Sequence, residues 1–180
     1  MVFVTQAAYT AALSGIATAI EDAADGEVAT PKKVVDQAAD EASTLAFGSP
    51  AEIGQYTVTV DSVVLNAAKE IAKANPFNDK ASGQYVLVEL SVVYNGDEEG
   101  NAWIDLSPEL VGSDSRIYDT STASMAVPPK PSTDVPTLVK GGKGTYQVVF
   151  DVPAAAVADA KIRVSETLSF NDESALWVTK

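Results

Sequence analysis

Residues 141–153 read GGKGTYQVVFDVP, and this stretch decides the fold class. Side chains of two kinds alternate along it, with Tyr146, Val148, Phe150 and Val152 on one face and Thr145, Gln147, Val149 and Asp151 on the other. This period of two is typical of a half-buried β-strand. The glycines before it suit a turn, and Pro153 cannot continue a ladder. We therefore expect one strand of an antiparallel all-β domain.

Further strands are predicted at residues 56–64, 85–94, 102–111, 116–118, 161–170 and 175–178. In the first of these the alternation slips in phase at Ser62, which indicates a bulge. In the second, Val86, Val88, Leu90 and Val92 form the core face, and Asn95-Gly96 ends the strand with a turn signal. Pro108 interrupts the third, so that strand is expected to bend or to lie at a sheet edge. Residues 67–74 favour a short helix.

Residues 127–136, VPPKPSTDVP, contain four prolines and show no periodicity. They are expected to form a long loop that crosses from one sheet to the other. About seven to eight short strands with such a crossover predict an antiparallel β-sandwich of Greek-key type. The residues expected to share its core are Val58, Val60, Val88, Leu90, Tyr146, Val148 and Phe150.

The first 44 residues differ in composition from the rest of the chain, because they are rich in alanine. Large apolar side chains recur there at spacings of three and four, the pattern of an amphipathic helix; they are Tyr9, Leu13, Ile16 and Ile20. Thr30-Pro31 resembles the start of a second, shorter helix. We predict a helical anchoring or oligomerisation segment at 1–44 and a sandwich domain at 45–180. The four-residue stripe either packs on its own domain or makes assembly contacts, and both interpretations stay open.

The composition is acidic, with 12 basic and 25 acidic residues and a net charge of -13. Such a charge repels nucleic acid and anionic lipid, so neither is an expected partner. No run of about 18 apolar residues occurs, so no membrane insertion is expected. Residues 2–20 lack the basic start and dense apolar centre of a signal peptide.

Cysteine and histidine are both absent from the sequence. Their absence excludes thiol nucleophiles, disulfides, structural zinc, the Ser-His-Asp triad and most transition-metal sites. Two Ser-Lys pairs remain, Ser124 with Lys130 and Ser132 with Lys140, but neither has the Ser-x-x-Lys spacing at a helix start. We expect no catalytic residue, no cofactor and no metal ion.

Two other clusters have both a functional and a structural interpretation. The run 95–101, NGDEEGN, alternates oxygen-bearing side chains like a calcium loop but lacks the full spacing and the terminal glutamate. A solvated acidic hairpin turn is the favoured interpretation. Trp103, Tyr118 and Trp177 would form a carbohydrate platform if exposed, although aromatics in a sandwich are more often core or edge-covering residues.

Three segments together resemble the DUF4352 family; they are YVLVELSVVYNGDEEG at 85–100, LVGSDSRIY at 110–118 and LVKGGKGTYQVVFDVP at 138–153. The resemblance extends over roughly residues 45–180 and implies an immunoglobulin-like sandwich related to the mycobacterial immunoprotective extracellular protein. It also implies a binding or structural module without catalytic activity, as in the secreted or lipid-anchored envelope proteins of Gram-positive bacteria and their phages.

The functional prediction is a non-enzymatic bacteriophage virion subunit, whether decoration, fibre or tail-associated, assembled in the host cytoplasm and displaying the sandwich. Its expected partners are further copies of itself, capsid or tail proteins, and a host cell surface. The alternative is a secreted or cell-envelope binding protein or antigen of a Gram-positive bacterium whose signal peptide has been removed.

Overall fold

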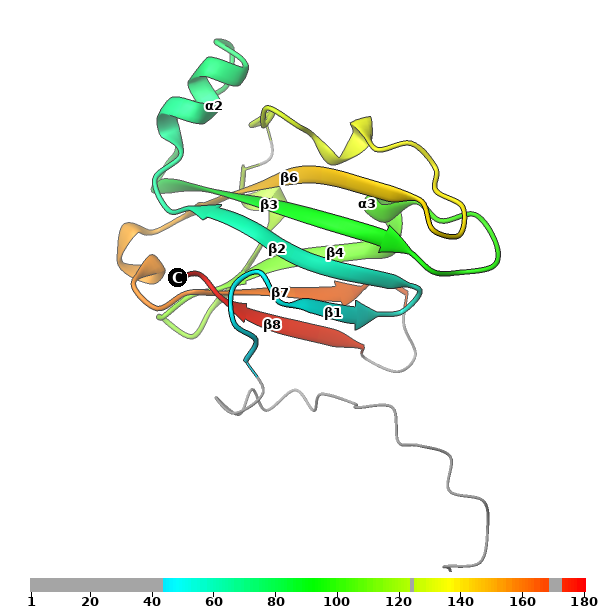
Figure 1. The fold of residues 1–180 in the computed structure, drawn as a ribbon. Coiled ribbons are helices and arrows are strands. Elements are labelled where there is room, and N and C mark those ends of the chain that lie inside the picture. The colour runs from blue at the N-terminus through cyan, green and yellow to red at the C-terminus, as the bar shows by residue number, and fades with distance from the viewer. Residues whose placement is uncertain (1–43, 124, 169–172) are drawn as a thin grey trace, which may run out of the picture. The chain divides into compact units, whose positions relative to one another are not determined.

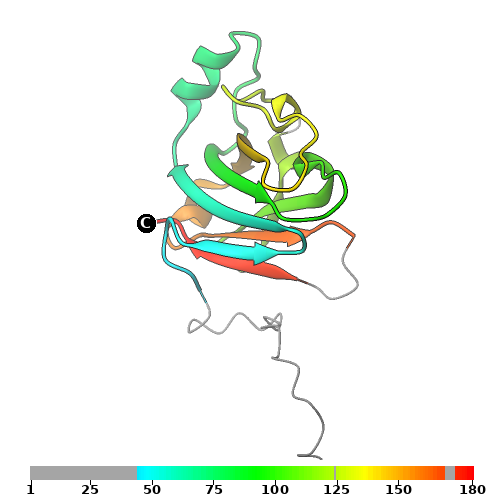
Figure 2. The same ribbon diagram turned by 45° about the vertical axis from the view of Figure 1, so that its right-hand side comes forward.

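The computed structural model describes residues 44–123, 125–168 and 173–180. These residues form two four-stranded antiparallel sheets, with strand orders β1-β2-β3-β6 and β5-β4-β7-β8. Figure 1 shows the two sheets as stacked layers, and the turned view in Figure 2 shows the gap that their inner side chains fill. The prediction of a mainly β, antiparallel sandwich is confirmed.

The first sheet consists of β1 (Pro50–Ile53), β2 (Tyr56–Val64), β3 (Gln84–Tyr94) and β6 (Lys143–Val152). The second consists of β4 (Leu106–Val111), β5 (Ile117–Asp119), β7 (Lys161–Glu166) and β8 (Ser174–Val178). The described helices are α2 (Ala68–Ala74) and α3 (Ala102–Asp105), with 3-10 turns η2 (Thr120–Ala123), η3 (Ser132–Asp134) and η4 (Ala154–Val157).

The core lies between the sheets and takes its side chains from alternate positions of every long strand. All seven residues predicted to share it are buried in one cluster with Leu110, Ile162 and Trp177 of the opposite sheet. The bulge in β2 is also confirmed, because the pairing with β3 shifts register between Val60 and Ser62. Asp61 is the extra residue of the bulge and has no partner in β3, so the inward and outward side chains of β2 exchange positions after it.

The first sheet buries side chains on its outer face as well. Tyr85 and Leu87 of β3 and Val149 of β6 form a second cluster with Ile71 of α2 and Ala123 of η2. The short α2 was predicted from its composition, and Ile71 is the side chain that it buries. This covering explains why residues 85–94 are apolar at nearly every position instead of alternating.

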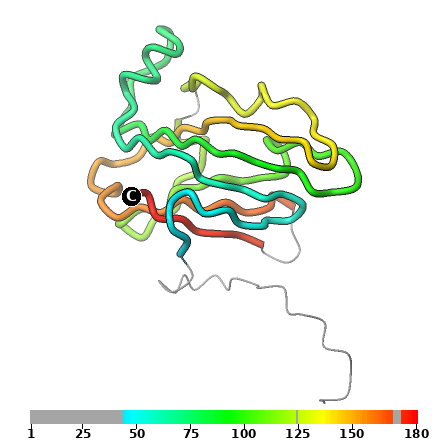
Figure 3. Tube along the Cα trace, viewed as in Figure 1, coloured from blue at the N-terminus to red at the C-terminus, as the bar shows by residue number. Residues whose placement is uncertain are grey.

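The outer edge of β6, which pairs with no further strand, is covered by the segment that connects β5 of the second sheet to β6. The Gln147 backbone N–H donates to the Lys130 carbonyl (2.7 Å), and the Asp151 N–H donates to the Thr122 hydroxyl (3.1 Å). In Figure 3 this segment runs beside β6 as a yellow tube. The predicted crossover loop is confirmed, with the turn η3 inside it.

The edge of β8 is covered in a similar way by the residues that precede β1. The Leu45 N–H donates to the Leu176 carbonyl (2.7 Å), and the Val178 N–H donates to the Leu45 carbonyl (3.1 Å). The indole N–H of Trp177 donates to the Ser49 carbonyl (2.7 Å). Trp177, which is buried in the core, therefore holds residues 45–49 in place.

The glycine turn before β6 has the conformation that its sequence indicates. Gly141 has φ of 79°, in the left-handed region that favours glycine. Its N–H donates to the Tyr94 carbonyl (2.7 Å), while the Tyr94 N–H donates to the Gly142 carbonyl (2.9 Å). The turn is thus fixed to the end of β3 before β6 begins.

Several element boundaries differ from the predictions. Residues 102–105 form α3 and not the start of a strand, because Asp105 accepts from the Asn101 N–H through its side chain (2.7 Å) and donates its own N–H to the Asn101 carbonyl (2.9 Å). Residues 95–101 are not a hairpin turn, since they connect β3 of one sheet to α3 and β4 of the other. Strand β7 ends at Glu166 and not at residue 170, and β1 was not predicted.

The two predicted N-terminal helices, with Tyr9, Leu13, Ile16 and Ile20, lie outside the described residues, so the division at residue 44 stays a prediction.

Candidate functional site

Two of the hollows in the described residues flank α3. This helix follows the loop after β3 and leads directly into β4. Ala102 is buried, whereas Trp103 is 50% and Ile104 48% exposed. We call this part of the molecule the α3 end; α2 precedes the start of β3 and so lies at its other end (Figure 1).

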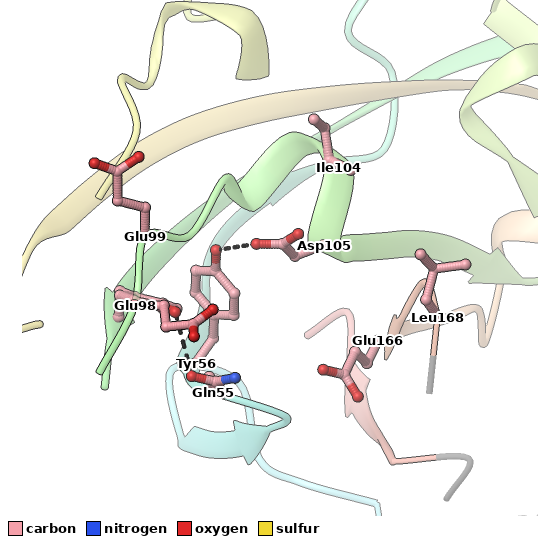
Figure 4. A pocket seen from close by; sticks show the side chains of 9 residues that line it. Gln55, Tyr56, Glu98, Glu99, Ile104, Asp105, Glu166 and Leu168 are labelled. Carbon is pink, nitrogen blue, oxygen red and sulfur yellow. Dashed lines mark hydrogen bonds between the residues drawn. The ribbon is translucent and has the colours of Figure 1, made fainter. Parts of the chain in front are cut away.

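An acidic pocket of about 170 Å³ lies on one side of α3 (Figure 4). Its lining includes four carboxylates and no basic side chain, and consists of Gln55, Tyr56, Tyr94, Glu98, Glu99, Ile104, Asp105, Glu166 and Leu168. These residues come from the β1–β2 turn and the start of β2, the end of β3, the loop 95–101, α3, the end of β7 and the residues after it. A pocket of this charge attracts cationic groups and repels anions.

The floor of the acidic pocket is a hydrogen-bonded pair. The Tyr56 hydroxyl donates to Oδ2 of Asp105 (2.5 Å), the same oxygen that accepts from the Asn101 N–H. Burial, followed by the hydrogen bond to Asp105, raises the pKa of Tyr56 far above its ordinary value. The phenol therefore stays protonated at neutral pH and acts as a donor, not as a base.

Tyr94 packs beside Tyr56, with ring centroids 5.0 Å apart and planes tilted by 54°. Its hydroxyl donates to Oε1 of Gln55 (3.2 Å). Gly100 passes so close that a Cβ there would lie 2.4 Å from the Tyr94 ring, which is why a glycine stands at this position. The aromatic pair and the loop 95–101 therefore hold each other in place.

The residues of the calcium-like run point to different partners. Asp97 pairs with Lys140 (2.6 Å), and the hydrogen bond from Lys140 lowers the pKa of Asp97 below its ordinary value. Glu98 and Glu99 line the acidic pocket. Among the described residues, no group of three or more carboxylates is placed to hold a metal ion.

A second hollow, of about 240 Å³, lies on the other side of α3. We call it the Tyr146 crevice; its lining is uncharged and consists of Trp103, Ile104, Leu106, Ser107, Pro108, Thr120, Ser132, Tyr146, Val148 and Thr167. The crevice forms because β5 is short and pairs only with residues 109–111 of β4. After β5 the chain turns away from β4 and continues toward β6. Residues 106–108 are paired with β7 alone, so one side of β4 is open there. The strand was expected to bend or to lie at a sheet edge because of Pro108; β4 is an inner strand, but its β5 side is unpaired at Pro108.

Tyr146 is 1% exposed, and its hydroxyl has no hydrogen-bond partner in the part of the chain that the structure describes. Burial raises the pKa of this phenol above its ordinary value. A buried, unpaired hydroxyl beside a hollow is unusual, because most such groups are satisfied in folded proteins.

Of the three aromatic candidates for a carbohydrate platform, Trp103 lines one of the two hollows described above. Trp177 is fully buried in the core, as the structural interpretation expected. The Tyr118 hydroxyl donates to Asp114 (2.6 Å) on the surface beside β5, which raises the pKa of Tyr118. Tyr118 lines neither of the two hollows.

The lysines of the two Ser-Lys candidates are engaged elsewhere. Lys130 bonds to Glu89 (2.9 Å) and Lys140 to Asp97 (2.6 Å). Ser124 lies outside the described residues, and Ser132 lines the Tyr146 crevice. Sequence reasoning missed Tyr56 and Asp105 as a pair, because the residues between them include a whole strand. Tyr146 was assigned to the core, and its sequence pattern gives no sign of an unpaired hydroxyl.

No helix in the described ranges is long and apolar enough to cross a membrane.

The family model for a domain of unknown function, DUF4352, matches residues 45–175, so the chain belongs to this family. The predicted family resemblance is thus confirmed. No curated protein matches the sequence.

Several solved structures are similar to this chain at low sequence identity. MPT63, a secreted protein from Mycobacterium tuberculosis, has a TM-score of 0.50 at 16% identity, with 75% of this chain and 97% of MPT63 covered. A conserved hypothetical protein from Bacillus anthracis has a TM-score of 0.47 at 15% identity, with 71% and 93% covered. The yjhA protein from Bacillus subtilis has a TM-score of 0.46 at 14% identity, with 74% and 97% covered. The likeness to MPT63 shows the sandwich fold.

Proposed function

We propose that this protein is a non-enzymatic binding protein, secreted or held at the cell envelope, and that the α3 end of its sandwich faces the ligand. The observation that carries the proposal is that large apolar side chains are exposed to solvent at this end. Trp103 and Ile104 are half exposed and Leu168 is 83% exposed, although the core between the sheets is complete without them. Exposed large apolar side chains grouped around hollows are typical of interaction sites.

The proposed location outside the cytoplasm is supported by the family and by the fold. MPT63 is a secreted protein, and it shares the sandwich architecture over most of its own length. The helical stripe on which the virion hypothesis depends lies outside the described residues, and no feature of the described sandwich favours a virion subunit over an exported protein.

The proposed lack of catalysis is supported by how the reactive side chains are arranged. The acidic pocket has four carboxylates and two phenols, and the phenols of Tyr56 and Tyr94 both have raised pKa values because they are buried. The lysines nearest to serine candidates are paired with carboxylates. Neither arrangement activates a nucleophile at neutral pH.

Fractionation of the source cells tests the proposed location. An antibody against the sandwich domain is used to probe cytosol, envelope, culture medium and sedimented particles, with one marker protein for each fraction. We expect the protein in the envelope or the medium. Recovery in the cytosol would overturn the proposal, and co-sedimentation with phage particles would overturn it in favour of the virion subunit.

A further inference from the structure

We propose that the Tyr146 crevice binds neutral carbohydrate, with one sugar ring stacked on Trp103 and a sugar hydroxyl bonded to the Tyr146 phenol. This inference rests on the proposed binding function and names the ligand class and the site. It assigns no role to the acidic pocket on the other side of α3.

The chemistry of the walls selects for an uncharged, polyhydroxylated ligand. None of the lining side chains is ionised at neutral pH, so a charged ligand would lose its hydration without gaining an ionic partner. Four of the lining residues carry aliphatic hydroxyls, which both donate and accept hydrogen bonds; they are Ser107, Thr120, Ser132 and Thr167. A wholly apolar ligand would leave these groups unpaired, whereas a sugar presents hydroxyls at a similar density.

Trp103 supplies the apolar surface that a sugar ring requires. It is half exposed, although Ala102, the residue before it in the same helix, is buried. The helix is held by the paired bonds between Asn101 and Asp105, so the indole projects from a fixed backbone. A tryptophan combines a large apolar face with little loss of side-chain freedom on binding, because it has few rotatable bonds.

Tyr146 supplies the buried polar group. It belongs to the inward-facing residues of β6, so its ring extends from β6 toward the opposite sheet, where residues 106–108 form the facing wall. Its hydroxyl is buried without a partner among the described residues, a state that costs free energy in the unliganded protein. The phenol oxygen is closed to solvent in the unliganded protein, so a sugar hydroxyl would reach it through a shift of the lining side chains, and that bond would form away from bulk water.

The size of the crevice limits the ligand. Its volume of about 240 Å³ lies below the range of about 300–1,000 Å³ usual for drug-sized ligands. The crevice therefore accommodates a single ring, such as the end of a glycan chain, while the rest of the chain extends into solvent.

The test is a titration of the full chain with glucose, N-acetylglucosamine, maltose, cellobiose and chitobiose, each followed by calorimetry and by tryptophan fluorescence. Sorbitol serves as an acyclic control. Because Trp177 is fully buried, a change in fluorescence reports on Trp103. We expect at least one cyclic sugar to saturate the signal in the millimolar range or below and sorbitol to have no effect.

Two variants localise the site. Trp103→Ala removes the stacking surface, and Tyr146→Phe removes only the hydroxyl; each is expected to weaken binding by about tenfold. Phe77→Ala is the matched control for an exposed aromatic, since Phe77 is 91% exposed after α2, and Tyr85→Phe is the control for a buried tyrosine hydroxyl. Both controls should bind like the wild type. Tyr146→Phe should melt at the same temperature as the wild type or higher.

The inference is overturned if no sugar binds at tens of millimolar, or if both site variants bind like the wild type. Binding only by lysine or by a basic peptide would also overturn it and would assign the ligand to the acidic pocket. None of these outcomes depends on where the protein is found in the cell, so the proposed location and the proposed ligand can fail separately.

Discussion

The phenol oxygen of Tyr56 lies 2.5 Å from Oδ2 of Asp105, and this hydrogen bond joins the two sheets at the α3 end. Tyr56 begins β2 of the first sheet, and Asp105 is the last residue of α3, directly before β4 of the second. The loop 95–101 and α3 are therefore fixed at both sides: to the first sheet by this bond, and to the second by the chain itself.

Replacing Tyr56 by phenylalanine should destabilise the domain by about 1.5–3 kcal/mol, because it removes a short hydrogen bond to a carboxyl group and leaves that group with one partner fewer. Urea unfolding measures the change. Tyr94→Phe is the matched control, since the Tyr94 hydroxyl donates to the uncharged Gln55 side chain at 3.2 Å, and its expected cost is about 1 kcal/mol or less. Equal losses of stability in the two variants would show that the hydrogen bond to Asp105 contributes no more than the one to Gln55.

The stability of the domain should fall steeply in alkali. Folding raises the pKa values of Tyr56 and Tyr146 above the ordinary 10.0, so the unfolded chain loses these protons at a lower pH than the folded chain. The stabilisation is fully present below about pH 10 and is lost as the pH rises through the folded pKa values. Urea midpoints measured from neutral pH upward, together with phenolate absorbance, check this. Ionisation of every tyrosine near pH 10 without unfolding would contradict it.

Replacing Phe150 by alanine should cost about 3–5 kcal/mol, because its side chain is fully buried between the sheets. Thermal and urea unfolding measure the loss. Phe77→Ala, at a position 91% exposed, should change stability by less than about 0.5 kcal/mol. A stable Phe150→Ala variant would mean that the inward face of β6 has been assigned wrongly.

A strong chelator should leave the melting temperature unchanged. The sequence has no cysteine or histidine, and the carboxylates of the described residues are not gathered in groups that hold an ion. Bound metal would stabilise the folded chain by mass action, so its removal would lower the melting temperature. Scanning calorimetry with and without chelator decides, and a drop of several degrees would point to the carboxylates of the loop 95–101.

Deleting residues 1–44 should leave the sandwich folded and abolish any self-association of the full chain. The expectation follows from the apolar stripe of Tyr9, Leu13, Ile16 and Ile20, which is too narrow to be stable alone and needs a partner surface. Sedimentation and circular dichroism of both chains provide the measurement. If the full chain is monomeric and the shortened one unfolds, the stripe belongs to the core of the sandwich.

The sandwich could be predicted from sequence because its long strands alternate cleanly and end at turn residues. The phase slip at Ser62, the glycine turn at Gly141 and the short helix 67–74 each have a local cause that the sequence displays. Residues 102–105 were mistaken for strand because Trp103 and Ile104 come shortly before Leu106. The bonds between Asn101 and Asp105 that close the helix are visible only in the structure. The residues around 50 carry a proline and a short apolar pattern, too little to indicate β1.

The candidate site was largely beyond sequence reasoning, because its residues come from distant strands. Trp103 was named together with Tyr118 and Trp177 as a surface candidate, but a core or edge-covering role was favoured for all three, with no means of separating Trp103 from Trp177. The difference between them is topological: Trp177 lies on an inner face of β8, whereas Trp103 lies on the helix that closes the end of the sandwich. The acidic pocket similarly joins Glu166 to Glu98 across two sheets.

The covered strand edges also bear on how copies of this domain can associate. Exposed edges are where β-proteins add strands from neighbours and aggregate. Here the outer edge of β6 is bonded to Lys130 and Thr122, and that of β8 to Leu45. The strand β5 and the open stretch 106–108 of β4 are each only three residues long, and β1 begins with a proline. Growth of a continuous sheet from one molecule to the next is therefore disfavoured in the described sandwich. Crowding many copies on a surface should therefore leave their sheets separate.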